Sequence, residues 1–310
     1  MLLLKILLIV AVLFFALLWG IYRFAFGVKR VHPENAHDIP KGEQYRPERA
    51  RMTKMIDDML AVPCERVSIT SRDGLKLSAR YYHVADGAPV EIELHGYRGS
   101  AIRDFCGGNR LSREAGRNML LIDQRGNGES EGRAITFGVR ERYDCLDWIG
   151  YVLKRFGPET KILISGISMG AATALMVAGM EELPANVVGV VADCPFTSPR
   201  EIICKVGHDL HLPMKLLYPL VRLSARLFGG FDPDSVSAVE GVKYARVPVL
   251  LMHGDDDRFV PCDMSRELYR NCASECTLLV TPRAGHGLSF ILDEAAYTRA
   301  TSEFARKLGV

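Results

Sequence analysis

The most apolar stretch of the chain lies at its N-terminus. Lys5 is the one charged residue in Met1–Tyr22, and positions 6–22 are all apolar, aromatic or small. This run is at the short end of what spans a bilayer, and extending it to Phe26, with Arg23 snorkelling to the surface, gives about 20 residues. A cleaved signal peptide is the alternative, but its apolar core is usually only ~7–15 residues long. The pattern therefore favours an uncleaved transmembrane anchor.

The charges that flank this run predict its orientation. A single lysine precedes it, whereas Arg23, Lys29 and Arg30 follow it. Because positive charge is enriched on the cytoplasmic side, we expect an anchor over residues 1–27 with the rest of the chain in the cytoplasm. Residues 28–60 are predicted to be a polar, proline-bearing linker with a short helix, which separates the anchor from the folded domain.

From residue 61 onward, an expected antiparallel hairpin is followed by apolar runs that alternate with segments of helical spacing. The predicted strands are 67–71, 75–82, 90–94, 119–123, 161–165, 187–192, 247–252 and 276–280. The predicted helices between them include 107–116, 139–156 and 171–181. This alternation is typical of a mostly parallel, doubly wound α/β sheet, in which functional residues lie at the carboxyl ends of the strands. We assign residues 61–310 to one such domain.

A serine follows one of these strands in the sequence Gly166-Ile-Ser168-Met-Gly170. A Cβ at position 166 or 170 would collide with neighbouring backbone in so tight a strand-to-helix turn. The turn pushes Ser168 out at the strand end and directs the N–H of Met169 into the same space. This arrangement predicts a nucleophilic serine.

An earlier strand ends in His95-Gly-Tyr97-Arg-Gly99. A loop of this kind can direct the Tyr97 N–H at the carbonyl oxygen that Ser168 would attack, and with the Met169 N–H it would form a two-donor oxyanion hole. The alternative is an ordinary turn glycine after a strand. The serine turn favours the functional interpretation.

The last two strands supply an acid and a base. Three aspartates follow one of them, and Asp257 fits the acid role best because its turn leads into a helix; Asp256 is second, and Asp255 is expected to bond local N–H groups. His286 lies between two glycines after the final strand. The order Ser168, Asp257, His286 is that of one particular fold.

The chain resembles the α/β-hydrolase superfamily, and most closely its membrane-anchored serine esterase branch. Further segments that carry the resemblance are Asp123–Gly132, which looks like the family's D-x-R-G-x-G-x-S-x-G loop, and Ala192–Phe196. The resemblance implies Ser168 as nucleophile, His286 as base and Asp257 as orienting acid. The resemblance does not indicate a substrate, because enzymes with many different chemistries share this fold.

Residues 197–246 interrupt the alternation with two helical stretches, 198–212 and 214–228, where one crossover helix would suffice. We expect a short helical cap over Ser168. Its apolar positions could face an acyl pocket, or they could simply pack the cap onto the sheet. These positions are Leu216, Leu217, Leu220, Val221, Leu223 and Leu227.

Composition narrows the possible functions. A net charge of +2 over 310 residues, with no basic stripe, argues against a nucleic-acid surface. The histidines show no metal-ligand spacing such as H-E-x-x-H, and the eight cysteines include no C-x-x-C, which fits a reducing compartment.

We therefore predict a hydrolase of carboxylic esters or thioesters that forms an acyl-enzyme on Ser168 and needs no metal or organic cofactor. Its substrate is expected to be a small or lipid-like acyl compound, and its membrane contact the N-terminal helix. An aminopeptidase or amidase would use the same residues but should show a carboxylate for amine recognition. A catalytically silent membrane scaffold is the alternative outside enzymes, against which the intact motif residues weigh.

Overall fold

The computed structural model describes residues 1–28 and 37–310; the predicted linker positions between them, Lys29 and Arg30 included, lie outside the described residues. Eight strands form one sheet in the order β1-β2-β4-β3-β5-β6-β7-β8. β1 pairs with β2, and β2 with β4, in antiparallel fashion, and the other neighbours are parallel. The strands are β1 (Glu65–Thr70), β2 (Lys76–Tyr82), β3 (Val90–Leu94), β4 (Asn118–Asp123), β5 (Ile162–Ile167), β6 (Val187–Asp193), β7 (Val249–Gly254) and β8 (Cys276–Thr281). The predicted mostly parallel sheet is confirmed.

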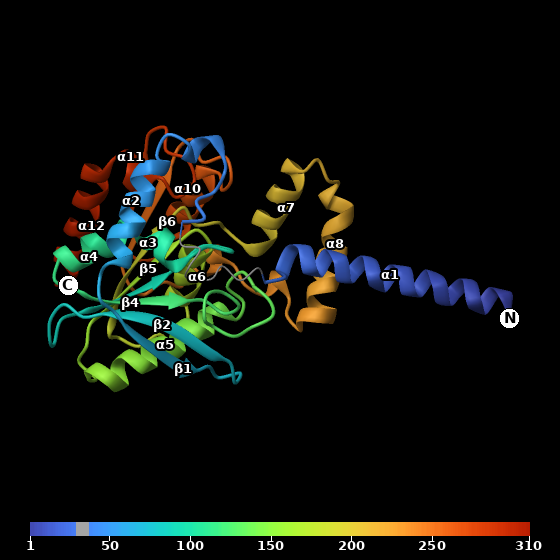
Figure 1. Ribbon diagram of the computed structural model, residues 1–310, viewed down its shortest axis with the longest axis horizontal. Coiled ribbons are helices and arrows are strands. Elements are labelled where there is room, and N and C mark those ends of the chain that lie inside the picture. The colour runs from blue at the N-terminus through green and yellow to red at the C-terminus, as the bar shows by residue number, and fades with distance from the viewer. Residues whose placement is uncertain (29–36) are drawn as a thin grey trace.

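Helices cover both faces of this sheet (Figure 1). The α-helices are α1 (Leu2–Phe26), α2 (Arg49–Leu60), α3 (Ala101–Phe105), α4 (Gly108–Glu114), α5 (Glu141–Phe156), α6 (Met169–Ala178), α7 (Pro199–Asp209), α8 (Met214–Ser224), α9 (Ala238–Lys243), α10 (Cys262–Asn271), α11 (Ser289–Leu292) and α12 (Glu294–Leu308). Single turns of other helix types are η2 (Glu43–Tyr45), η3 (Ala225–Gly229) and η4 (Pro233–Ser235).

Alternate side chains of each central strand enter two separate cores. In β4, Leu120 and Ile122 join the core that contains α5 and α6, whereas Met119 and Leu121 join the core that contains α2, α3 and α11. The alternation follows from the period of two residues in a strand. Because both faces are buried, strands such as β4 and β7 appear in the sequence as nearly continuous apolar runs, whereas β3 carries Glu91 and Glu93 on its second face.

The N-terminal helix α1 is the one helix among the described residues that is long and apolar enough to cross a membrane. Its last turns are nevertheless part of the folded body, since Leu18, Tyr22 and Phe26 are buried. The Phe26 ring lies 5.1 Å from that of Phe231, and the carbonyl of Phe26 accepts the N–H of Ile135. This packing differs from the expectation of a separable anchor.

The segment between β6 and β7 contains α7, α8, η3, η4 and α9. Figure 1 shows α7 and α8 projecting from the sheet towards α1, and α1 packs against both α8 and η3. α9 instead returns to the body, where it packs on α6. The predicted pair of cap helices therefore exists, and it is joined to the N-terminal helix.

Candidate active site

The turn between β5 and α6 holds Ser168 in a backbone conformation that L-residues rarely adopt. Its φ is 56° and its ψ is −112°, and its N–H donates to the carbonyl of Asp193 at 2.8 Å. A Cβ at Gly166 would overlap the backbone of Gly170, and a Cβ at Gly170 would overlap the carbonyl of Leu94. Such strain persists only where the surroundings enforce it and is concentrated at functional sites. The two glycines therefore permit the sharp turn, as the sequence predicted.

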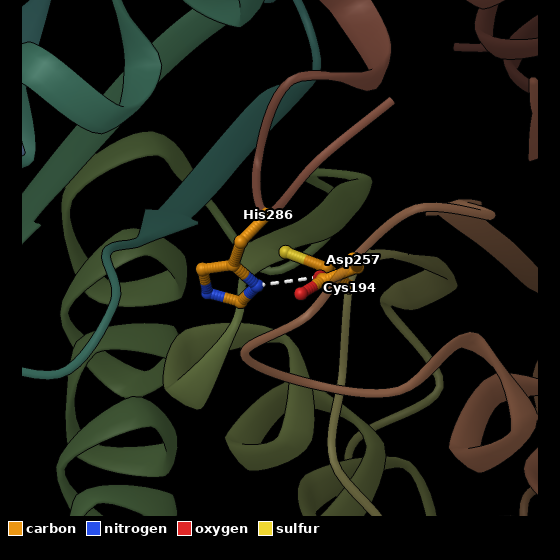
Figure 2. Close-up of side chains that lie close together, drawn as sticks. All are labelled: Cys194, Asp257 and His286. Atoms are coloured by element: carbon orange, nitrogen blue, oxygen red, sulfur yellow. Dashed lines mark hydrogen bonds and ion pairs between the residues drawn. The ribbon is translucent and has the colours of Figure 1, made fainter. Parts of the chain in front are cut away.

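Three predicted residues, far apart in the sequence, meet at this turn. The Nε2 of His286 lies 3.0 Å from the Oγ of Ser168, and its Nδ1 lies 2.6 Å from the Oδ2 of Asp257. Figure 2 shows Asp257 directed at the His286 ring. All three lie on segments that follow the carboxyl ends of parallel strands, β5, β7 and β8. The chain thus brings a hydroxyl, an imidazole and a carboxylate into one line of hydrogen bonds.

The other two aspartates of the acid turn make different contacts. Asp256 pairs with Arg258 at the surface, and Asp255 accepts the backbone N–H of Arg283 at 2.5 Å. Asp257 accepts the N–H groups of Phe259 and Val260 through its Oδ1, which leaves its Oδ2 for His286. The local hydrogen bonds therefore fix the carboxylate in the orientation that the contact with His286 requires.

Burial alone would raise the pKa of the Asp257 carboxyl, but hydrogen bonds from His253 and His286 outweigh it and hold this pKa below its ordinary value. The Nε2 of His253 lies 3.2 Å from the Asp257 Oδ2. The carboxylate is therefore ionised at neutral pH. An ionised partner at Nδ1 stabilises the tautomer of His286 whose Nε2 can accept a proton from Ser168.

Cys194 completes the immediate surroundings of this pair. A sulfur, carboxylate oxygen and ring nitrogen of Cys194, Asp257 and His286 all lie within 4.8 Å of one another (Figure 2). Metal ligation requires a thiolate, whereas burial raises the pKa of the Cys194 thiol well above its ordinary value. The 2.6 Å separation of Asp257 and His286 is also that of a direct hydrogen bond. The cluster therefore favours proton transfer over metal binding.

The expected oxyanion donors belong to two segments that meet beside Ser168. A Cβ built at Gly96 would lie 3.5 Å from the Ser168 Cβ, so the loop of Tyr97 approaches the nucleophile closely. The N–H of Gly96 donates to Asp104 at 2.8 Å, which fixes the loop. Met169 is the first residue of α6, where backbone N–H groups have no intrahelical acceptor. Both positions suit the role that the sequence suggested.

The same loop is tied to the end of α1, which the sequence did not indicate. The Tyr97 hydroxyl donates to the carbonyl of Ala25 at 2.9 Å. The Arg98 guanidinium donates to the carbonyls of Phe24 and Gly27 at 2.9 and 2.7 Å. A cation at a helix C-terminus satisfies carbonyls that have no intrahelical donor. The N-terminal helix thus ends directly on the loop beside the nucleophile.

A cavity of about 410 Å³ opens beside Ser168 and His286. Its walls come from residues 40–55, from α3 and α4, and from α11 and α12. The apolar side chains of this wall include Met52, Met55, Phe105, Leu111, Leu163 and Phe290. The helical spacing of α2 was visible in the sequence, but nothing in that spacing shows that the helix borders the nucleophile.

The cap leucines do not form this cavity. None of the six apolar positions proposed for an acyl pocket is among the described residues that line it. Val221 is buried in the core, Leu217 and Leu220 are half-buried, and Leu216 and Leu223 are exposed. The interpretation of the cap as the acyl pocket is therefore wrong. The space beside the nucleophile is bordered instead by α2, which supplies Met52 and Met55.

Known proteins resemble this chain in sequence and in fold. Residues 92–231 match the model of the alpha/beta hydrolase fold family. The YqkD protein of Bacillus subtilis is 27% identical over 226 residues, which cover 72% of this chain and 73% of that protein. The lysophosphatidylserine lipase ABHD12 of Xenopus tropicalis is 27% identical over 202 residues, which cover 60% of this chain. Those residues span 47% of the lipase, so the chain matches about half the length of this relative.

Solved structures share the fold at lower sequence identity. The esterase Pf2001 of Pyrococcus furiosus superposes with a TM-score of 0.64 at 23% identity, covering 81% of this chain and 94% of the esterase. The esterase Est1E of Butyrivibrio proteoclasticus, solved with ferulic acid, gives a TM-score of 0.58 at 22% identity and covers 78% of this chain and 98% of its own. The chain has the α/β-hydrolase fold.

Proposed function

We propose that this chain, which belongs to the α/β-hydrolase superfamily, is a serine hydrolase that cleaves carboxylic esters or thioesters through an acyl-enzyme on Ser168. The main support is the continuous line of hydrogen bonds from Ser168 through His286 to Asp257 beside an apolar cavity. A nucleophile within hydrogen-bond reach of a base, which is itself oriented by a third group, is the signature of covalent acyl transfer.

In the proposed reaction, the Oγ of Ser168 attacks the carbonyl carbon while the Nε2 of His286 accepts its proton. The tetrahedral oxyanion receives hydrogen bonds from the N–H groups of Tyr97 and Met169, and each such donor lowers the barrier by about 2.7–4 kcal/mol. His286 then gives its proton to the leaving alcohol or thiol. Water hydrolyses the acyl-enzyme by the same sequence of proton transfers, with Asp257 stabilising the imidazolium.

The substrate is proposed to carry a lipid-like acyl chain. The cavity begins at Ser168, and much of its wall is apolar, which suits an alkyl chain bound next to the reacting carbonyl. The lipase ABHD12, whose name assigns it lysophosphatidylserine, matches over 60% of this chain. A membrane ester with one long acyl chain therefore fits both the cavity and the relationship.

The helix α1 is proposed to anchor the enzyme in a membrane. Residues 1–17 are all exposed, which is costly for so apolar a surface in water. The positive charges after the apolar run, Arg23 in the last turn of the helix and then Lys29 and Arg30, favour the cytoplasmic side for the catalytic domain. In this proposal, residues 61–310 form the catalytic domain and residues 1–27 form the membrane anchor.

The charges in the cavity favour an ester over an amine-bearing substrate. Asp104 is paired with Arg103 at 2.7 Å, and Glu91 with Arg117 at 2.8 Å. A third carboxyl, that of Asp193, has a pKa raised to about 6, first of all by burial. Peptidases that recognise an N-terminal amine need a carboxylate available to pair with it. Two of these three carboxylates are already paired with arginine, which leaves the buried Asp193 as the one of the three that could receive an amine, so the aminopeptidase alternative has less support than the esterase.

Labelling with a fluorophosphonate tests the chemistry directly on the full-length protein in detergent. We expect the phosphonyl group on the peptide that contains Ser168. Ser168→Ala should remove the label and lower ester turnover by about 10⁶-fold, as loss of the nucleophile does in other triad hydrolases. Ser302→Ala, which changes an exposed serine on α12, is the matched control and should retain both. A folded protein that resists the probe would support the silent scaffold instead.

A further inference from the structure

The exposed part of α1 is too short to cross a bilayer by itself. Only residues 2–17 precede Leu18, the first residue buried against the rest of the protein. At about 1.5 Å per residue they rise about 24 Å. The hydrocarbon core of a bilayer is about 30 Å thick and needs about 20 helical residues. The proposed span must therefore include the turns from Leu18 onward.

The position of Lys5 further shortens the exposed apolar part of α1 that is available to cross the bilayer. If its ammonium group lies at the far headgroup boundary, the apolar run begins at Ile6 and has to continue close to Phe26 to reach the other side. The turns that contact the folded body would then lie at the level of the near lipid boundary. Any segment that packs against those turns of α1 therefore also lies at the level of the near lipid boundary.

The cap packs against these last turns of α1. The ring of Phe228 lies 5.1 Å from that of Trp19 and 5.8 Å from that of Tyr22. In Figure 1, α8 runs across α1 rather than along it, and α1 contacts both α8 and η3. A helix that crosses a membrane-spanning helix in this way lies close to the plane of the bilayer. Trp and Tyr are also the residues enriched at that boundary.

The cap has an exposed apolar stripe that suits this position. Leu216, Pro219, Leu223 and Leu227 are all exposed, and their spacing of three, four and four residues places them on one side of α8 and η3. The exposed fractions of the three leucines are 75%, 42% and 49%. Leu210 and Leu212, in the turn before α8, are also exposed.

We propose that α8 and η3, together with the turn that precedes α8, lie in the lipid interface, with this leucine stripe against the acyl chains of a phospholipid bilayer. Single exposed leucines are normal on protein surfaces, whereas a contiguous stripe beside a membrane helix has an obvious apolar partner. Exposed basic groups at Lys215 and Arg23 suit the anionic headgroups of the same surface. The inference rests on the proposed membrane span and not on the proposed chemistry.

Photolabelling by lipid tests this position. The full-length protein would be reconstituted into vesicles of phosphatidylcholine and phosphatidylserine that contain a phospholipid with a diazirine in its acyl chain. Tryptic peptides 6–23 and 216–222 report α1 and the cap, and peptide 271–283 reports the edge strand β8, with the half-buried Leu278 and Leu279 and no residue that lines the cavity. We expect label on the first two at least ~10-fold above the third, because side chains in water do not meet acyl chains.

Each labelling result decides the inference. Label confined to peptide 6–23 would place the cap in water and overturn it, while the span would stand. Absence of label from peptide 6–23 would contradict the span, and the inference with it. Neither result depends on whether Ser168 is catalytic, so failure of the chemistry is distinguishable through the fluorophosphonate experiment.

A pair of charge substitutions sharpens the test. Leu216→Glu with Leu223→Glu should lower the labelling of the cap peptide severalfold and leave that of α1 unchanged. Leu60→Glu with Leu292→Glu, at two exposed leucines outside the cap, is the matched control and should change neither. Circular dichroism checks that each variant folds. Undiminished labelling of the cap in a folded variant would show that the stripe does not contact lipid.

Discussion

The loops that hold the reacting groups are built differently from the wall of the cavity beside them. Each loop follows the carboxyl end of a strand and is fixed by its own backbone, as when Asp257 accepts two N–H groups within three residues of itself. The wall is assembled from helices far apart in the chain, such as α2 and α11, which share one core. Local backbone therefore fixes the chemistry, and long-range packing fixes the space for the acyl chain.

This contrast has a kinetic consequence. A change in the loops should alter turnover of every ester by the same factor, since all substrates share the reacting carbonyl. A change in the wall should alter only those substrates whose chain reaches it. The cap does not line the cavity. A change in the cap should therefore alter the turnover of neither short nor long soluble esters.

Asp257→Asn should have the largest effect. The amide would favour the wrong tautomer of His286 and would not stabilise its cation, so we expect kcat to fall by about 10⁴-fold for short and long esters alike. Asp256→Asn, at the neighbouring position that pairs with Arg258, is the matched control and should keep nearly full activity. Steady-state kinetics on p-nitrophenyl esters of increasing length measures both. Equal activity of the two variants would show that the acid is misassigned.

Much of the site was predictable because its determinants are local. The glycines around Ser168 and the short loops after β3, β7 and β8 can be recognised within a few residues of sequence. The strands β5, β7 and β8 are largely apolar runs, whereas β3 alternates apolar residues with Glu91 and Glu93. The choice of Asp257 among three aspartates followed from the helix after its turn. The structure brings that residue, and neither neighbour, to His286.

The cavity was not predictable by the same means. The leucine-rich cap has the composition of an acyl pocket, but it packs against α1, and Leu216, Leu223 and Leu227 are exposed. Residues 40–55 begin in a polar, proline-bearing segment and yet supply Tyr45 and Met52 to the cavity. Which helix borders the nucleophile depends on contacts between segments more than a hundred residues apart, and amphipathic spacing carries no information on the partner of an apolar face.

A substitution that narrows the cavity should have the next largest effect on ester turnover. Met55→Trp would fill part of the cavity beside Gly107, whose added Cβ would already lie 2.9 Å from the Met55 Cε. If the chain loses room for two methylenes, kcat/KM for long esters falls by about 15-fold, at ~0.8 kcal/mol for each methylene. Acetate esters should change little. Steady-state kinetics on p-nitrophenyl esters of increasing length provides the measurement.

Leu217→Trp is the matched control for the wall. It enlarges a half-buried leucine of the cap that does not line the cavity, so the chain-length profile for soluble esters should stay as in the parent protein. If the cap variant shortened the preferred chain and Met55→Trp did not, the acyl site would lie under the cap, and the contrast between the two regions would be reversed.

The smallest effect is expected where the two regions meet. The Tyr45 hydroxyl, from the wall, donates to the backbone carbonyl of His286 at 2.9 Å. A neutral hydrogen bond of this kind contributes about 0.5–1.5 kcal/mol, so Tyr45→Phe should lower kcat by at most about tenfold. Because the bond supports the histidine loop and not the chain-binding space, the loss should be equal for acetate and long-chain esters. A selective loss with long chains would mean that Tyr45 acts through the shape of the cavity, and the division between chemistry and wall would then not hold at this residue.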